Sequence, residues 1–454
     1  MRELTRKQIM QDIKFYDCRV IEGSSTSIIL DNGKIEEISR NFTRGAGIRA
    51  LCGGSWGYTA VEGELDLEKG VRDAAKLAFA MNENTPKEEV ELAASPAPVV
   101  SNLPGIKVDP RDVSIEEKVE LLKNIESRAR VEGVHSTKVM FSESEFKIMY
   151  RNSEDVECEY ELLNTGFAVS AVATENGVYQ AGRESRFGYG YELFENIDVL
   201  GLAEKAGKTA VELLGAKTPK GGTMPVLLDQ ELAGVFAHEA VGHASEADLV
   251  LEGDSILANR VGENIASPLV TIIDDPTLHE FGYYPFDAEG VESSRTEIIK
   301  DGVLNSYLHS RETAGKLGEE TGTPGNSRAQ GYSMPIVRMS NTFIDNGDSK
   351  FEEMLESVRD GMYLIGSRGG QVNTGEGIFQ FNAEKGYLIK NGELAELVRD
   401  VSLSGKTLEI LNHVTGVGND LKMTAGRCGK GGQLVPVSDG SPHLAISRAL
   451  VGGA

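Results

Sequence analysis

Residues 26–38 read Thr26-Ser27-Ile28-Ile29-Leu30-Asp31-Asn32-Gly33-Lys34-Ile35-Glu36-Glu37-Ile38, which places two apolar runs on either side of an Asn-Gly dipeptide. Asn and Gly both tolerate a positive φ, so this pattern is a strong signal for a β-hairpin. The strand-like pattern continues in both directions, from Val20 to Val61. We therefore expect the first part of the chain to be built on strands joined by tight turns.

Helices are expected on both sides of these strands. The patterns predict a short helix over 1–13, a helix over 67–81 with apolar residues at three- and four-residue spacing, and a helix over 197–214. Ser114 and Glu117 have the spacing of a capping box and begin a further helix that runs to about Val131. Residues 84–110 hold five of the fourteen prolines and no clear period, which predicts a long connection. Strands are expected between Lys138 and Val172.

The best domain boundary is Lys217-Thr218-Pro219-Lys220-Gly221-Gly222. It separates an N-terminal domain (1–216) from a C-terminal domain (222–454). In the second domain we expect a strand over 224–228, one conspicuous helix over 229–247 and one other clear helix over about 349–361. Short strands there are separated by Asp301-Gly302, Asn346-Gly347 and Asn391-Gly392. The predicted fold class is α+β: an N-terminal α/β-type domain, then a β-rich domain of mostly antiparallel sheet.

Composition limits the possible partners. The chain has 454 residues, 70 of them acidic and 46 basic, and its formal charge of −24 disfavours nucleic acid and anionic membranes. No apolar run approaches the ~20 residues of a transmembrane helix, and the first residues lack the apolar segment of a secretory signal. The four cysteines are too few and too scattered for a disulfide framework. These features predict a cytoplasmic protein.

The most informative stretch is Phe236-Ala237-His238-Glu239-Ala240-Val241-Gly242-His243. It places two of only seven histidines five positions apart, with a glutamate directly after the first. Zinc proteases use two imidazoles and a general-base glutamate on one helix, but their histidines are four positions apart. Residues five apart on an α-helix point ~140° apart, because each residue turns ~100°. Either the two histidines share no metal, or the helix widens into a π-type turn or ends between them, which Gly242 would make easier.

Other residues leave the ligand set open. Glu239 and His243 form an alternative ligand pair at i,i+4 spacing, and a third ligand has to come from elsewhere in the chain. The best candidate is Cys428, because a thiolate suits zinc and its glycine-rich surroundings allow close approach, although such a cysteine can equally be an ordinary turn residue. The same segment lacks the spacing of a phosphate-binding P-loop, so we reject a nucleotide site. We interpret the remaining histidines and cysteines as structural: His135, His279, His309, His413, His443, Cys18, Cys52 and Cys158.

The order and spacing of several short motifs resemble the TldD/PmbA family over nearly the whole chain. They are His238-Glu239-Ala240-Val241-Gly242-His243, Asp287-Ala288-Glu289-Gly290, Met334-Pro335-Ile336-Val337-Arg338-Met339-Ser340-Asn341-Thr342, Gly369-Gly370-Gln371-Val372-Asn373, Tyr387-Leu388-Ile389-Lys390-Asn391-Gly392, Val417-Gly418-Asn419-Asp420 and Cys428-Gly429-Lys430.

This resemblance implies a zinc-dependent peptidase (a metalloprotease) that hydrolyses unfolded or extended peptides. Carried over to this chain, the zinc ligands are His238, His243 and Cys428, and Glu239 is the base. The family pairs a subunit that carries the motif with a PmbA/TldE-like subunit that lacks it, so a heterodimer is expected, with a homodimer as the form of the chain alone. The alternative is a non-catalytic binding or scaffold subunit of the same family with a structural metal site, which would be closed by four protein ligands.

Overall fold

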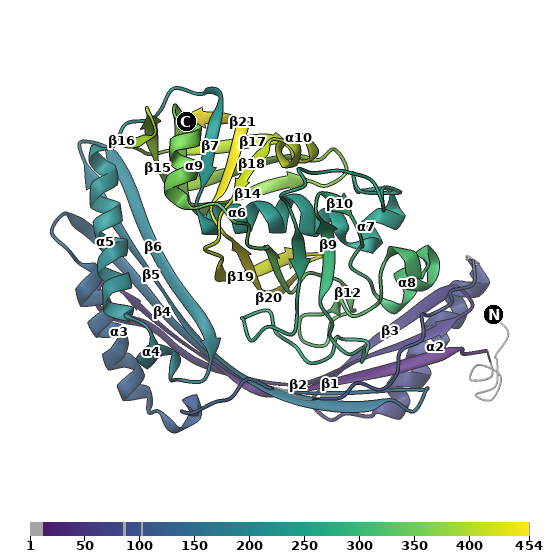
Figure 1. Cartoon of the computed structure of the whole chain (residues 1–454). Helices are drawn as coiled ribbons and strands as arrows, with labels where there is room; N and C mark the ends of the chain where they lie inside the picture. Colours follow the sequence, from purple (N-terminus) through teal and green to yellow (C-terminus); the bar gives the residue numbers. More distant parts are fainter. Residues whose placement is uncertain (1–11, 85–87, 101–102, 454) are drawn as a thin grey trace.

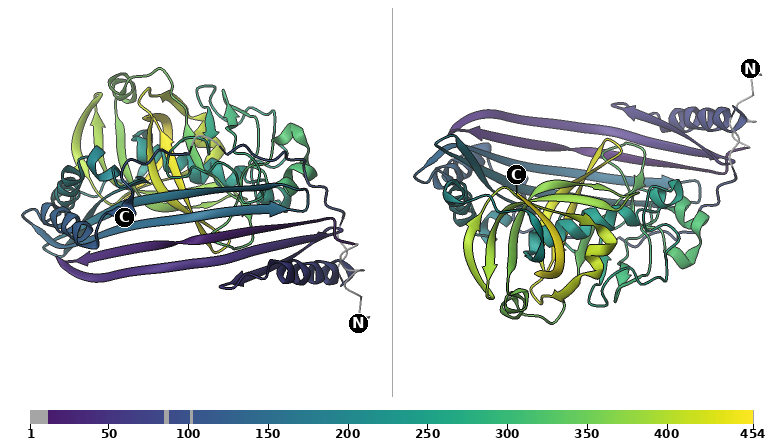
Figure 2. Two further views of the ribbon diagram at one scale, coloured as in Figure 1. Left: turned by 90° about the horizontal axis from the view of Figure 1, so that it is seen from below. Right: turned by 90° about the horizontal axis from the view of Figure 1, so that it is seen from above.

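A long curved sheet cradles a β-rich C-terminal part in the computed structural model, which describes residues 12–84, 88–100 and 103–453 (Figure 1). The predicted helix over 1–13 falls almost entirely outside these residues. Seen from below and from above, the long strands lie along one side of the molecule and the C-terminal part on the other (Figure 2). No helix in the described ranges is long and apolar enough to cross a lipid bilayer.

The curved sheet has six strands in the order β3-β2-β1-β4-β5-β6, and all its pairings are antiparallel. Its longest strands have 19 residues each, which corresponds to about 60 Å at ~3.3 Å per residue. The strand bounds are Phe15–Asp31 (β1), Lys34–Cys52 (β2), Ser55–Glu62 (β3), Val134–Asn152 (β4), Glu157–Glu175 (β5) and Val178–Tyr189 (β6).

Helices cover the two ends of this sheet. Helix α2 (Leu67–Asn84) packs on β1 and β2 at one end, and α3 (Ile115–Ala129), α4 (Leu193–Asn196) and α5 (Val199–Gly215) cover the other (Figure 1). The predicted capping box starts α3: Ser114 accepts from the Glu117 N–H, and the Glu117 carboxylate accepts from the Ser114 N–H. After Asn84, where α2 ends, the described residues of the 84–110 connection form no helix or strand before Pro110. Within the described residues, the predicted helices and strands of this half are therefore confirmed, and β6 and α4 are added to them.

Two sheets make up the C-terminal part. The first has the order β10-β9-β8-β13-β20-β19; the second runs β14-β7-β21-β17-β15-β16 and closes into a barrel because β14 also pairs with β15. Most pairings are antiparallel, as predicted, with β14–β7 and β13–β20 parallel. The bounds are Ile272–Asp274 (β8), Thr296–Lys300 (β9), Val303–Leu304 (β10), Asn341–Ile344 (β13), Lys422–Lys430 (β19) and Gln433–Ser441 (β20); then Gly222–Leu228 (β7), Gly361–Asn373 (β14), Ile378–Lys390 (β15), Glu393–Val398 (β16), Val401–Lys406 (β17), Val414–Val417 (β18, beside β21) and Leu444–Gly453 (β21). A small ribbon pairs Ser327–Arg328 (β11) with Ile336–Val337 (β12).

Two predictions for this part are wrong. Residues 229–247 do not form one helix: α6 (Gln230–Phe236) runs into a π-helical turn (Ala237–Gly242), a 3₁₀ turn (His243–Ser245) and then α7 (Ala247–Glu252). The helix predicted over 349–361 is α9 (Phe351–Val358), but it is not alone, since α8 (Arg311–Leu317) and α10 (Thr407–Asn412) are also present. Both additional helices span fewer than two turns, which is too short to produce a visible apolar period. The fold class is nevertheless the predicted mixture of helix and sheet with a β-rich C-terminal part.

The C-terminal part is held on the curved sheet by buried polar contacts. Arg49 on β2 lies 3.1 Å from Glu289 and also pairs with Asp17, and all three side chains are buried. Arg19 on β1 donates to the Gly331 carbonyl at 2.5 Å. Charges buried in this way are stabilised only while their partners stay in place, so these contacts fix the C-terminal part relative to the sheet.

Candidate metal centre

Helix α6 places the motif directly on β20. Asp229 caps the helix by accepting from the Leu232 N–H at 2.9 Å, immediately after β7 ends. The apolar side of the helix is buried in the core of the C-terminal part. Gly234 lets the helix approach the strand closely, since a Cβ there would lie 3.0 Å from the Gly440 nitrogen. The first histidine of the motif is therefore carried against β20.

The π-helical turn brings the two motif histidines together. The His243 N–H donates to the His238 carbonyl, which is an i→i+5 bond, and the two imidazole rings are 5.2 Å apart at their centroids and nearly perpendicular. The predicted departure from a regular α-helix between them is thus confirmed, in its π-turn form.

Gly242 has a different role from the one expected of it. Its φ of −55° and ψ of −55° are ordinary helical values that any residue adopts. A Cβ at this position would instead overlap the Met339 sulfur, and Met339 is wholly buried. Glycine is therefore required for space between the turn and its neighbour, and not for backbone freedom.

Strand β19 brings Cys428 to the same point. Its sulfur lies 3.3 Å from Nε2 of His243, and one ligand atom from each of His238, His243 and Cys428 lies within 4.8 Å of the others. All three residues are buried. Two imidazole nitrogens and a thiolate fit Zn²⁺, and three protein ligands are the number found at catalytic zinc sites with an open position. Among the described residues, no fourth His, Cys, Asp or Glu joins this cluster.

The cluster favours the ligand form of the cysteine. Burial alone would raise the pKa of the Cys428 thiol, but hydrogen bonds and charge from both imidazoles outweigh burial and lower this pKa to about 5. Burial would lower the pKa of His243, yet the carboxylate of Glu246 and the Cys428 sulfur raise it to about 10. The thiolate is the form that binds metals, and the imidazoles would release their protons when a cation enters.

Glu239 lies at the open side of the cluster. Its side chain is 30% exposed, whereas those of His238 and His243 are 4% and 12% exposed. Its Oε2 is 3.9 Å from Nε2 of His243, so it is near the cluster without being part of it. Burial raises the pKa of Glu239, and the neighbouring imidazoles only partly oppose that effect. A carboxylate with a raised pKa beside a solvent-accessible position suits proton transfer.

A carboxylate oxygen lies close to Nδ1 of each imidazole. Nδ1 of His238 is 2.6 Å from Oδ1 of Asp439 on β20, and Nδ1 of His243 is 2.9 Å from Oε2 of Glu246. Lys430 then lies 3.1 Å from Glu246. The sequence could have suggested Glu246 and Lys430, which lie three and two positions from a predicted ligand. Asp439 has no such signal, because it reaches the site only through the pairing of β20 with its neighbours.

The other histidines lie outside this cluster. His309 is wholly buried between Thr313 Oγ1 at 3.0 Å and the Thr321 carbonyl at 3.1 Å, and burial lowers its pKa to about 4. His443 pairs with Asp420 at 2.5 Å. Neither joins a metal-binding group among the described residues.

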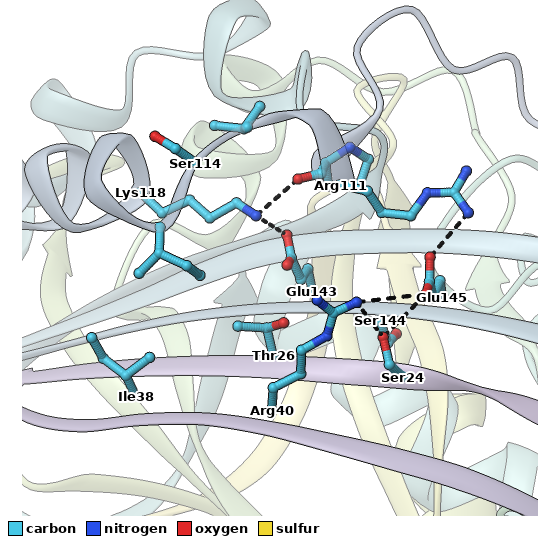
Figure 3. Close-up of a pocket in the computed structure, with 13 residues that line it drawn as sticks. Ser24, Thr26, Ile38, Arg40, Arg111, Ser114, Lys118, Glu143, Ser144 and Glu145 are labelled. Carbon is cyan, nitrogen blue, oxygen red and sulfur yellow. Dashed lines mark hydrogen bonds and ion pairs between the residues drawn. The ribbon is translucent and has the colours of Figure 1, made fainter.

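A cavity of about 440 Å³ lies away from the motif, on β1, β2, β4 and the start of α3 (Figure 3). Its cations are already neutralised: Lys118 is 2.7 Å from Glu143, and Arg111 is 3.0 Å from Glu145. None of the four predicted site residues lines this cavity, so it does not compete with the cluster as the reactive centre.

Family models and relatives match both the N-terminal and the C-terminal part of this chain. Three models of the PmbA/TldA metallopeptidase match: domain 1 over residues 16–81, the central domain over 108–214 and the C-terminal domain over 221–453. A metalloprotease of Archaeoglobus fulgidus is 48% identical over 97% of this chain and 100% of its own length. A protein of Saccharolobus solfataricus named as a zinc metalloprotease TldD homolog is 30% identical over 92% of this chain and 91% of its own.

Solved structures share the fold. A putative modulator of DNA gyrase from Thermotoga maritima has a TM-score of 0.81 at 23% identity and covers 98% of this chain and 99% of its own. TldE from Thermococcus kodakarensis has a TM-score of 0.77 at 19% identity, with 98% of each chain covered. At these identities the likeness concerns the arrangement of helices and strands.

Proposed function

Because the chain belongs to the PmbA/TldD metallopeptidase family, we propose that it is a zinc-dependent peptidase with His238, His243 and Cys428 as zinc ligands and Glu239 as general base. One observation carries this proposal: two imidazole nitrogens and a sulfur converge within 4.8 Å, beside a glutamate that is accessible to solvent. A site that only stabilised the fold would need a fourth protein ligand and no neighbouring base.

The chemistry divides between the metal and the protein. A zinc ion bound at this cluster would supply a Lewis acid that lowers the pKa of water and polarises a peptide carbonyl. Glu239 accepts the proton of the attacking water and passes it to the leaving amine. Its raised pKa suits both steps, since the same group must take up a proton and release it. His238 and Cys428 are buried, whereas the side chain of Glu239 is the more exposed one beside them, so Glu239 can exchange protons with solvent.

We propose unfolded or extended peptides as the substrates. Strand β19 carries Cys428 and forms the edge of its sheet, pairing among the described strands with β20 alone. An extended peptide could add to this edge through backbone hydrogen bonds, which tolerate many side-chain sequences. The scissile bond would then lie beside the cluster that β19 helps to build.

The setting of the enzyme is part of the same proposal. We propose a heterodimer with a PmbA/TldE-like partner, supported by the fold shared with TldE. A cytoplasmic location agrees with four cysteines that are all free and buried. We also keep the division into domains 1–216 and 222–454, which falls between α5 and β7.

Metal analysis combined with proteolysis of an unfolded protein tests this function. Purified chain, alone and with a PmbA/TldE-like partner, should contain one zinc per chain and degrade unfolded casein, and chelation should abolish hydrolysis until zinc is restored. His238→Ala should abolish both zinc binding and hydrolysis. Hydrolysis that survives removal of zinc, or stoichiometric zinc in the His238→Ala variant, would contradict the proposal.

A further inference from the structure

Each motif histidine has a carboxylate close to its Nδ1, and the two carboxylates come from different elements. Asp439 on β20 faces Nδ1 of His238 at 2.6 Å, and Glu246, just after the 3₁₀ turn, faces Nδ1 of His243 at 2.9 Å. An imidazole that donates its Nδ1 proton to a carboxylate presents Nε2 as the free ligand nitrogen. Nε2 of His243 does point toward the Cys428 sulfur, 3.3 Å away.

Lys430 joins the histidine segment to the cysteine strand. It follows Cys428 by two positions on β19, and side chains two apart on a strand point to the same face. Its ammonium lies 3.1 Å from Glu246 and 2.7 Å from Asp248, and it donates to the Val337 carbonyl at 3.0 Å. One cation thus holds two carboxylates of the helical segment against the strand that carries Cys428.

The ion pair between Lys430 and Glu246 is costly to break because both side chains are largely buried. Glu246 is completely buried, and the Lys430 side chain is only 16% exposed. A buried carboxylate without a cation is strongly destabilising, so Glu246 and Lys430 keep each other in place. The backbone of the cysteine is fixed as well, because Arg338, also completely buried, donates to the Cys428 carbonyl at 2.6 Å.

We infer that Glu246, Lys430 and Asp439 are positioning residues: Glu246 and Asp439 set the tautomer and direction of the two imidazoles, and Lys430 sets the distance between His243 and Cys428. The inference rests on the proposed function, because it takes these three side chains to hold ligands of zinc. It adds that the geometry of the centre depends on a charged link between β19 and the segment after the π turn, and not on the ligands alone.

Zinc affinity of the full-length chain, measured by competition with a chromophoric chelator, tests the inference. Lys430→Met and Glu246→Gln should each bind zinc about 10–100-fold more weakly, the usual effect of losing a group that orients a ligand. Asp439→Asn should also weaken binding, and Lys430→Arg should restore most of the affinity because it keeps the cation. Lys422→Met is the matched control, since Lys422 is an exposed lysine on the same strand, and it should bind as the wild type does.

The spectrum of the cobalt-substituted protein gives a second readout that does not depend on hydrolysis. The visible bands of Co²⁺ should change in Lys430→Met and Asp439→Asn and stay unchanged in Lys422→Met. Wild-type affinity and spectrum in folded Lys430→Met would overturn the role of the link. If Lys430→Met does not fold, Asp439→Asn decides the inference, and wild-type behaviour in that variant overturns it. Failure of the proposed function would look different, because the wild-type chain itself would then lack zinc or hydrolysis.

Discussion

Gly242 offers the sharpest test of how the motif is built. Replacing it with alanine adds one methyl group at the end of the π-helical turn, directly against the Met339 sulfur. Alanine at an ordinary helical glycine stabilises a protein, because it reduces the freedom of the unfolded chain. Here the backbone already has helical angles, so that gain is available, and only the overlap with Met339 opposes it.

The two effects can be weighed from the structure. Replacing glycine with alanine should raise the free energy of unfolding by about 0.4–1 kcal/mol through the unfolded chain. An extra methyl group in a filled core typically lowers the free energy of unfolding by about 1–3 kcal/mol. Met339 is wholly buried, so its sulfur has little room to move away and the upper part of that cost applies. We expect Gly242→Ala to lower the free energy of unfolding by about 1–2 kcal/mol. Since the displaced turn carries His243, zinc should also bind more weakly.

Urea unfolding and chelator competition measure both effects. Gly215→Ala is the matched control, because Gly215 ends α5, is exposed and would place its Cβ in open space. That variant should be as stable as the wild type or more so, with zinc affinity unchanged. In a Met339→Ala background, the cost of Gly242→Ala should disappear, which would identify Met339 as its cause. If Gly242→Ala is as stable as the wild type and binds zinc equally well, the reasoning about this turn is wrong.

Three further outcomes follow from the same geometry. Glu239→Gln should keep its zinc and lose hydrolysis by ~100-fold or more, because the amide cannot accept a proton; loss of zinc, shown by metal analysis, would instead make Glu239 a ligand. Cys428→Ala should lose zinc while Cys158→Ala, which alters a buried cysteine on β5, retains it, and equal zinc contents would exclude the sulfur as a ligand. The fold keeps His309 neutral by lowering its pKa from 6.5 to about 4, so the stability it contributes is complete above pH 6.5 and is lost as the pH falls toward 4. Between about pH 8 and pH 5 this loss amounts to about 2 kcal/mol, and urea unfolding should show a smaller loss for His309→Gln than for the wild type.

Features that depend on neighbouring residues were predictable from the sequence. The turns at Asn32-Gly33, Asp301-Gly302 and Asn391-Gly392 all have positive φ at both residues and join antiparallel strands, because that preference is intrinsic to Asn, Asp and Gly. The Asn346-Gly347 dipeptide instead lies between β13 and α9, where it joins a strand to a helix. A dipeptide marks a turn, but the elements on either side decide what the turn connects.

Features that depend on distant residues were not predictable in the same way. The spacing of His238 and His243 required some distortion of the helix, yet the pattern could not choose between a π turn and a helix end. That choice depends on packing against residues such as Met339, about 100 positions later in the chain. Asp439 shows the same limit, since only the pairing of β20 brings it to His238. The residues of the candidate centre could be named from the sequence, but the groups that orient them could not.

From the placement of β7 beside β21 we expect a particular order of events when this protein folds. Their partners Leu228 and Leu444 are separated by 216 positions (444 − 228), so their pairing closes a very long loop. Contacts of such high contact order form slowly, because the entropy of loop closure is lost before the contact repays it. The histidine helix follows β7, and the cysteine strand β19 lies in the neighbouring sheet shortly before β21 in the chain, so we expect the three donors to converge only after these distant segments have met. In a zinc finger the metal drives folding, whereas in this chain the proposed zinc ligands would meet only after these distant segments have paired, so we expect zinc to bind late in folding.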